Sequence, residues 1–201
     1  MKNVVKKMNG RAVSFSVSLM LASAFVLCSC EKVTVDVPVD RIVIELDDIL
    51  VEDGSTSKSG LALKSDDGLN KFDVTRDVNL SDLSLDNDVL KYQSRIKDVI
   101  VGAPSITVTS ASGEGTVVKD FVMKVDGVHS ISIAQYNLGS EYTADLADLQ
   151  TFCQKAILNL LLKGSISVAL SGKTDVAAGE SLNVEIVMND VVIKAKLNSD
   201  E

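Results

Sequence analysis

The segment Val117–Tyr136, VVKDFVMKVDGVHSISIAQY, decides the fold class of this chain. Valine and isoleucine are frequent on both sides of Asp126-Gly127, and these residue types favour strands. Aspartate and glycine tolerate the positive φ angles that a tight two-residue turn demands. The segment therefore predicts a β-hairpin whose strands are Val117–Val125 and Val128–Tyr136.

Other strand-like segments lie on both sides of this hairpin. Val33, Val35 and Val37 alternate with polar residues, which is the two-residue period of a strand. Pro38 ends that run or lies at a sheet edge, because proline has no amide hydrogen for the ladder. Turn signals at 52–60, 66–68, 112–115 and 172–179 separate further expected strands. These strands are Arg41–Val51, Phe72–Leu80, Ile96–Ser110 with a break at Gly102-Ala103-Pro104, Ser165–Ser171 and Ser181–Leu197.

A long amphipathic helix is expected between the hairpin and the last two strands. Apolar residues recur at spacings of three and four through Thr143–Lys163, which is the helical period. Thr143 is the expected N-cap, since its hydroxyl can accept a free amide of the first turn. Gly164 is the expected terminator, because glycine readily takes the left-handed conformation after a helix.

A shorter helix, capped by Asp86 or Asn87, is expected to end near Arg95. Strands otherwise dominate, and they do not alternate regularly with helices as they would around a parallel sheet. The chain is therefore expected to be mainly β, an antiparallel β-sandwich of immunoglobulin-like type with one long and one short helical insertion.

The N-terminal region has the organisation of a bacterial lipoprotein signal. Four basic residues lie in the first eleven positions, and residues 12–29 carry no charge. The run ends in Leu27-Cys28-Ser29-Cys30, where a large aliphatic residue and small residues precede a cysteine. In such a signal the cysteine thiol takes a diacylglyceryl group and becomes the first mature residue. We therefore expect lipidation of Cys30 and loss of Cys28 with the signal peptide.

Two alternatives explain this apolar run less well. An uncleaved membrane anchor needs roughly 20 apolar residues, and four serines dilute the run. A plain secretory signal needs small residues before the cut, and Val26 and Leu27 fit that requirement poorly. The pattern predicts a signal peptide at 1–29, a lipid-tethered segment at 30–40 and a single β-rich domain at 41–201.

The region up to Cys28-Ser29-Cys30-Glu31-Lys32 resembles the lipoproteins that are abundant in Bacteroidetes-type bacteria. The segments Val33–Pro38 and Tyr92–Lys97 are similar in style to their small, uncharacterised β-sandwich lipoproteins. This resemblance implies a lipid-anchored protein of the cell envelope. The outer membrane is the expected location, with the periplasmic and surface faces both open. The resemblance assigns no activity and no named family to the mature domain.

Composition narrows the range of partners. The signal holds four of the 20 basic residues and none of the 28 acidic ones, so the mature chain would have a formal net charge of −12. Nucleic-acid binding is not expected, because it needs a basic surface. The chain has no tryptophan and few other aromatic residues, which weakens a carbohydrate-binding interpretation. The membrane contact is therefore expected through lipidated Cys30 alone.

Two single residues are candidates for chemistry. His129 could act as a base near Ser130 or Asp126, but no G-x-S-x-G motif supplies a strained nucleophile, so a hairpin residue facing water is favoured. Cys153 could be a reactive thiol, but it lies on the apolar stripe of the long helix and is expected in the core. With Cys30 lipidated, Cys153 has no disulfide partner. We expect no catalytic residues, and one histidine with one free cysteine rules against a zinc site.

Acidic clusters are the remaining candidates for a metal site. Asp82, Asp86, Asn87 and Asp88 offer oxygen ligands for calcium, but their spacing differs from the EF-hand loop and helix capping explains them. Asp47-Asp48 and Asp66-Asp67-Gly68 are more typical of solvated turns. Gly113-Glu114-Gly115 lacks the lysine and following helix of a phosphate loop. We expect neither a metal nor a cofactor.

These observations favour a non-enzymatic binding or structural lipoprotein with a protein partner in the envelope. A sandwich edge can add a strand from such a partner. The alternative is a binder of a lipid or another apolar ligand, held between the 143–163 helix and the sheet. An enzyme is the third possibility, and it would depend on His129.

Overall fold

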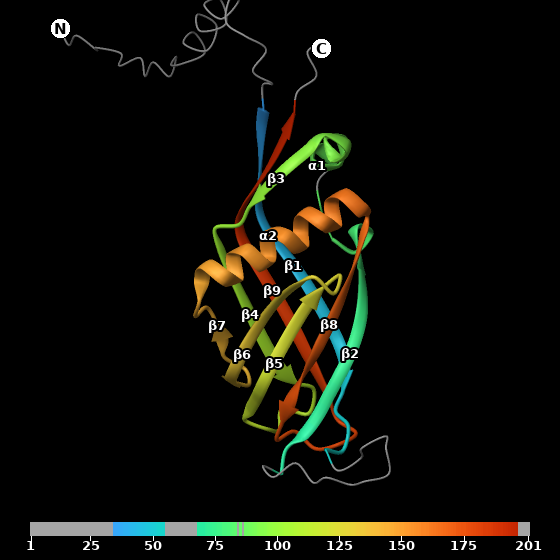
Figure 1. Cartoon of the computed structure of the whole chain (residues 1–201), viewed down its shortest axis with the longest axis vertical. Helices are drawn as coiled ribbons and strands as arrows, with labels where there is room; N and C mark the ends of the chain where they lie inside the picture. The colour runs from blue at the N-terminus through green and yellow to red at the C-terminus, as the bar shows by residue number, and fades with distance from the viewer. Residues whose placement is uncertain (1–33, 55–67, 84, 86, 197–201) are drawn as a thin grey trace, which may run out of the picture. The chain divides into compact units, whose positions relative to one another are not determined.

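The computed structural model describes residues 34–54, 68–83, 85 and 87–196 (Figure 1). Among these residues, no helix is both long and apolar enough to cross a membrane. The elements, in chain order, are β1 (Thr34–Leu50), β2 (Asn70–Asn79), the 3-10 helix η1 (Leu80–Asp82), α1 (Asn87–Lys91), the 3-10 helix η2 (Gln93–Arg95), β3 (Ile96–Ile100), β4 (Ala103–Ser110), β5 (Val117–Val125), β6 (His129–Asn137), β7 (Glu141–Tyr142), α2 (Leu146–Lys163), β8 (Ser165–Thr174) and β9 (Ser181–Lys196).

The strands form two antiparallel sheets. The first has the order β1-β9-β4-β7, with β3 also paired to β9, and the second has the order β2-β8-β5-β6. The predicted mainly β fold with two packed antiparallel sheets and helical insertions is confirmed. The immunoglobulin-like assignment stays a prediction.

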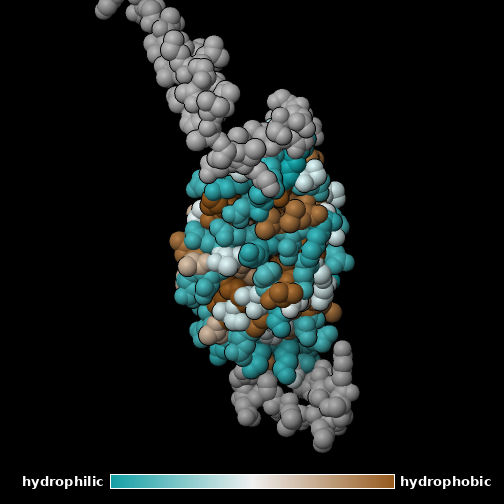
Figure 2. All heavy atoms as spheres, turned by 45° about the horizontal axis from the view of Figure 1, so that its top comes forward, coloured by the Kyte–Doolittle hydropathy of each residue, from teal (hydrophilic) through white to brown (hydrophobic). Residues whose placement is uncertain are grey.

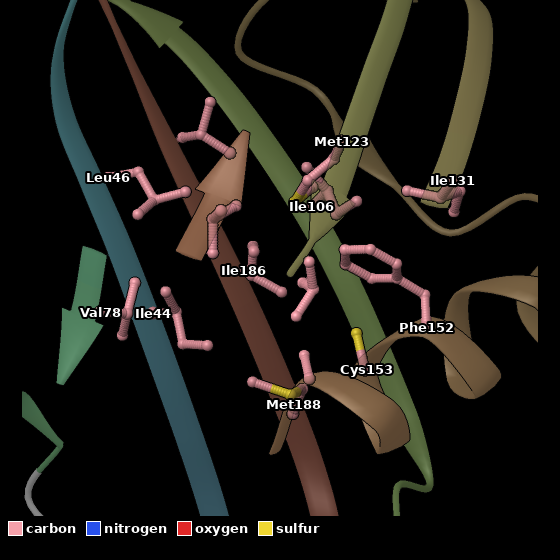
Figure 3. Close-up of a cluster of buried hydrophobic side chains, with 14 of the residues drawn as sticks. Ile44, Leu46, Val78, Ile106, Met123, Ile131, Phe152, Cys153, Ile186 and Met188 are labelled. Atoms are coloured by element: carbon pink, nitrogen blue, oxygen red, sulfur yellow. The ribbon is translucent and has the colours of Figure 1, made fainter. Parts of the chain in front are cut away.

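Alternating apolar residues of the two sheets fill the space between them. On β1 and β9 the directly opposite pairs Ile42–Met188, Ile44–Ile186 and Leu46–Val184 are all buried. Figure 3 shows Ile44, Leu46, Ile186 and Met188 turned towards side chains of the second sheet and of α2. These side chains are removed from water on one face, while their neighbours in sequence face outward.

Tyr136 joins the two sheets by hydrogen bonds. It lies on β6, and its hydroxyl accepts from the Val108 amide and donates to the Ile106 carbonyl of β4, both at 3.3 Å. The ring is buried, so the hydroxyl needs these partners. This side chain therefore pins one open side of the sandwich, next to α2.

Helix α2 covers that side. It crosses the strands in Figure 1 and packs against β3, β4, β6 and β8. Figure 3 shows Phe152 and Cys153 projecting from α2 towards the strand side chains. The helix ends as predicted, with Gly164 at φ 82° and its amide donating to the Leu160 carbonyl at 2.8 Å.

The predicted start of α2 is wrong. Asp145, not Thr143, is the N-cap, and it has a left-handed conformation with φ 52°. Its carbonyl accepts from the amides of Asp148 and Leu149 at 3.0 and 3.1 Å. The Tyr142 hydroxyl also donates to the Asp145 carboxylate at 3.0 Å. These contacts hold the chain in a turn before the helix, so the N-cap lies two residues later than the sequence pattern predicts.

The predicted short helix is divided. Helix α1 ends at Lys91, and a separate 3-10 turn, η2, follows before β3. The Tyr92 amide donates to the Val89 carbonyl, and the Arg95 amide donates to the Tyr92 carbonyl, which are the three-residue hydrogen bonds of a 3-10 turn. Of the two predicted caps, Asp86 lies outside the described residues and Asn87 is the first helical residue.

The hairpin is present, but its turn is longer than predicted. Asp126 and Gly127 have φ angles of 51° and 70°, as the sequence indicates. Strand β6 begins at His129, opposite Val125, so the loop comprises three residues and Val128 is not in the strand. The Asp126 amide donates to the Ser167 carbonyl of the neighbouring strand β8 at 2.8 Å, and this hydrogen bond joins the turn to β8.

The first strand starts earlier than the predicted domain boundary at 41. Residues 34–39 pair with β9, from Thr34 opposite Lys196 to Val39 opposite Val191. Pro38 lies within this strand, and β1 is at the edge of its sheet. An edge strand pairs with a neighbour on one side only, so a proline is tolerated there although it has no amide hydrogen to donate.

Shortening a buried side chain on α2 should destabilise the fold far more than shortening an exposed one. Leu160 is 0% exposed and Leu162 is 53% exposed. We expect Leu160→Ala to lower the free energy of unfolding by about 2–5 kcal/mol, because it removes contacts and leaves a cavity. Leu162→Ala should change it by less than about 0.5 kcal/mol. Urea denaturation followed by circular dichroism measures both, and equal losses would contradict this packing.

Candidate functional site

A large hollow in the described part of the chain lies between the edge strands of the two sheets. We call it the β1–β2 groove, and its volume is about 600 Å³. It is lined by Arg41–Asp47 of β1, Arg76–Val78 of β2, and Asp82, Leu83 and Leu85 from the segment that follows β2. The groove is thus on the side of the sandwich opposite Tyr136 and α2.

Two contacts close one end of the groove. Glu52 and Lys71 form an isolated antiparallel bridge, with amide-to-carbonyl distances of 2.7 and 3.0 Å. One step further along, the Arg76 guanidinium donates to the Asp48 carbonyl at 2.8 Å. β1 and β2 belong to different sheets and pair with different neighbours. The strands therefore separate, and the groove opens between them.

The floor of the groove is apolar. Ile42, Ile44 and Leu46 of β1 are buried, as is Val78 of β2. Figure 3 shows Val78 beside Ile44 and Leu46. Leu83 and Leu85 are half-buried and pack against this core, so they are partly accessible from the groove.

The rim of the groove is acidic. Glu45, Asp47 and Asp77 are exposed, and Asp82 adds a fourth carboxylate. Arg41 lies 3.5 Å from Glu185, and Arg76 donates to the neutral Asp48 carbonyl and keeps its charge. The four carboxylates outnumber the two arginines, so the groove is negative overall. Figure 2 shows the wider surface in one view, where apolar residues are scattered among hydrophilic ones.

Asp82 is held in place by local hydrogen bonds. Its carboxylate accepts from the Asn79 amide at 3.0 Å, from the Asn79 side chain at 3.2 Å and from the Ser81 hydroxyl at 3.2 Å. These hydrogen bonds, chiefly that of the Asn79 amide, lower the pKa of Asp82. Asp82 thus stays ionised at the groove while it caps η1.

A second groove contains His129. It lies between β6 and the first half of α2, has a volume of about 540 Å³, and is mostly polar. Within the described residues, no hydrogen bond joins His129 to Ser130 or to Asp126. The structure therefore places these three candidates near one hairpin end without arranging them as a base with its nucleophile. The residues that line this groove are Val128, His129, Ser130, Ile131, Ser132, Asp145, Asp148, Thr151, Phe152 and Lys155.

Asp126 has a structural role instead. Its carboxylate accepts from Lys163 Nζ at 2.6 Å, from the Ser167 amide at 3.0 Å and from Asn159 Nδ2 at 3.2 Å. It thereby ties the hairpin turn to the end of α2 and the start of β8. The Lys163 hydrogen bond, followed by that of the Ser167 amide, lowers the pKa of Asp126 below its usual value near 3.8.

Replacing the Asp126 carboxyl should make the free energy of unfolding depend less on pH in the acid range. A carboxyl whose folded pKa is lowered stabilises the fold above its unfolded pKa, and this contribution is lost as the pH falls through the folded pKa. Asparagine also tolerates a positive φ, so Asp126→Asn keeps the turn and removes the charge. We expect a loss of about 1–2 kcal/mol at pH 7. The difference from the parent should shrink below pH 4. A constant difference in urea unfolding across this range would contradict the contact.

Cys153 lies in the core, as predicted. It is 1% exposed on α2, and burial raises the pKa of its thiol to about 12. A thiolate is the reactive form of cysteine, so this thiol is unreactive in the folded protein. The predicted role of Cys153 as a small apolar side chain agrees with this environment.

Thiol labelling tests the position of Cys153. In a Cys28→Ala, Cys30→Ala chain it is the single remaining cysteine. We expect a disulfide reagent to react with less than about a tenth of the thiol at pH 8 in native buffer within minutes, because the thiolate form is rare there. Reaction should be complete in 8 M urea as about one thiol per chain. Rapid reaction without denaturant would show that the core is more open than the packing indicates.

The remaining acidic candidates do not form a metal site within the described ranges. No group of three or more histidine, cysteine or acidic side chains converges there. Asp82 lines the β1–β2 groove, Asp86 lies outside the described residues, and Asn87 and Asp88 lie in the backbone of α1. Asp47 lines the groove and Asp48 has a φ of 54°, whereas Asp66 and Asp67 also lie outside the description. Gly113–Gly115 lies in the connection between β4 and β5.

The predicted lipidation site Cys30 and the whole signal region lie outside the described residues. Comparison of the chain with protein-family models, with curated proteins and with solved structures found no match.

The sequence did not indicate the β1–β2 groove. Charged residues at Arg41, Glu45 and Asp47 are a signal of an exposed strand. That signal does not say which strand of the other sheet lies alongside, or whether a helix covers the gap between them. Arg76 and Asp77 lie more than 25 residues away in the chain, and only the strand order brings them to the groove.

Proposed function

We propose that this chain is a lipid-anchored lipoprotein of the bacterial cell envelope whose β-sandwich is a non-enzymatic binding or structural module for an envelope protein. The observation that carries the proposal is Leu27-Cys28-Ser29-Cys30 at the end of an uncharged run behind a basic start. Two acyl chains suffice for stable anchoring, and each buried methylene adds about 0.8 kcal/mol. The outer membrane is the proposed location.

The position of β1 in the sequence adds a geometric consequence. Three residues separate Cys30 from Thr34, where β1 begins. An extended chain spans at most about 3.6 Å per residue, so Thr34 would lie within about 14 Å of the lipidated cysteine. A lipid on Cys30 would therefore hold the sandwich close to the membrane by the end that contains Thr34.

The body supports a binding role more than a catalytic or apolar-ligand role. Asp126 is engaged by Lys163 and Ser167, so it does not orient His129. The apolar face of α2 is packed into the core, and the groove beside α2 is mostly polar. The larger β1–β2 groove instead has an acidic rim and an exposed strand edge, which suit a polypeptide partner.

Metabolic labelling tests the anchor. We expect a clickable fatty acid to label the parent chain expressed in a Gram-negative host, and we expect Cys30→Ala to abolish the label, because Cys30 provides the acylated thiol. Cys28→Ala is the matched control, since that thiol would be removed with the signal peptide. In-gel fluorescence measures the label. An unlabelled parent, or equal labelling of the Cys30→Ala chain, would overturn the proposed function.

A further inference from the structure

We propose that the β1–β2 groove binds an extended segment of an envelope protein as an added β-strand on the free edge of β1, and that this segment alternates apolar with basic residues. This inference rests on the proposed function and names the partner chemistry of its binding module. Three properties of the groove support it: a free backbone edge, an apolar floor and an acidic rim.

The backbone edge supplies the hydrogen bonds. From Arg41 to Leu46, β1 pairs continuously with β9 on one side. On its other side, no strand among the described ranges pairs with this stretch, and all seven residues Arg41–Asp47 line the groove. Every second residue of an edge strand directs its amide and carbonyl outward, where an extended peptide can pair with them. Seven residues extend over about 23 Å, the length of an ordinary strand.

The floor selects apolar side chains on one face of the added strand. Side chains of neighbouring strands point to the same face at directly opposite positions. A residue opposite Ile42, Ile44 or Leu46 would therefore point inward and meet Leu83 and Leu85. Burying a valine or isoleucine there would remove about as much apolar surface from water as core packing does elsewhere.

The rim selects basic side chains on the other face. Residues of the added strand that lie opposite Glu45 and Asp47 would point outward, close to these two carboxylates, and Asp77 also lines the groove. Oppositely charged cross-strand pairs are each worth about 0.2–1 kcal/mol. An acidic segment would be repelled, and so would a second copy of this chain, because its mature part has a net charge of −12.

A designed peptide tests the groove directly. The probe is an acetylated and amidated eight-residue peptide that alternates lysine with valine or isoleucine. The protein is the full chain produced in a bacterial envelope and purified in non-ionic detergent. We expect the peptide to slow hydrogen exchange of amides within residues 41–47 at least about fivefold, because added-strand pairing protects them. The amides of the opposite edge strand, Glu141 and Tyr142, should not change.

Matched variants separate strand addition from general charge attraction. Glu45→Lys should weaken peptide binding at least about fivefold in fluorescence anisotropy, whereas Glu141→Lys, the same charge change on the edge strand β7, should change it less than about twofold. A peptide methylated on alternate backbone nitrogens keeps the side chains, but should lose protection of residues 41–47. Because only the peptide is changed, this comparison requires no substitution in the protein that could disturb its fold.

Four results would overturn the inference. The first three are absence of protection at 41–47, equal weakening by Glu141→Lys, and equal protection by the methylated peptide. The fourth is self-association of the chain through residues 41–47, detected by sedimentation, which would show that a second copy is the occupant. Fatty-acid labelling does not depend on the groove, so a negative peptide result with intact labelling removes this inference and leaves the anchor proposal standing.

Discussion

The pairing of β9 with strands on both sides is the interaction on which the rest of the structure depends. Along one side it pairs with β1 over almost its whole length, and along the other it pairs first with β4 and then with β3. β9 therefore contributes a row of fully buried side chains to the core, Ile186 and Met188 among them. Because β1 and β9 come from opposite ends of the described chain, this ladder joins the two ends of the body.

The two open sides of the sandwich are closed by different structures, and this difference leaves the candidate site open on one of them. On one side, α2 supplies Phe152, Cys153 and Leu160 to the core, and the Tyr136 hydroxyl links the sheets. On the other side, polar contacts join the edges, among them the Glu52–Lys71 bridge, the hydrogen bond from the Gly54 amide to the Asn70 side chain and the contact of Arg76 with Asp48. A hydrophobic helix is a large cover, whereas a few polar contacts leave space between strands. The groove is thus a consequence of where the chain places its one long helix.

Aspartates at positive φ shape the ends and bends of the elements. Among the residues that the structure describes, five non-glycine residues have this conformation, and all five are aspartates. Asp48 lies where the β1–β9 register shifts, Asp120 lies at a similar shift between β5 and β8, and Asp145 precedes α2. The short carboxylate tolerates the left-handed region better than most side chains do. Only Asp126 could be anticipated, because a glycine follows it and strands flank it.

Local pattern determined much of this protein. Period-two alternation, the Asp-Gly turn and the Gly164 terminator correctly predicted a mainly β chain with its hairpin and long helix. The same local pattern placed Cys153 in the core, because its helical neighbours at three- and four-residue spacing are apolar. The proposed lipidation signal at Leu27–Cys30 is also a local pattern, since it lies within four consecutive residues.

Tertiary structure decided the features that depend on distant residues. Thr143 matched a cap, but the hydrogen bond from Tyr142 to Asp145 and the turn around it moved the helix start. The Asp126 carboxylate could have faced His129, but Lys163 and Ser167 bind it. The pairing of β1 with β9, and the position of β2 beside β1 without a cover, left the groove open. Strand order is set by the burial of all faces together, so no single segment of the sequence contains that information.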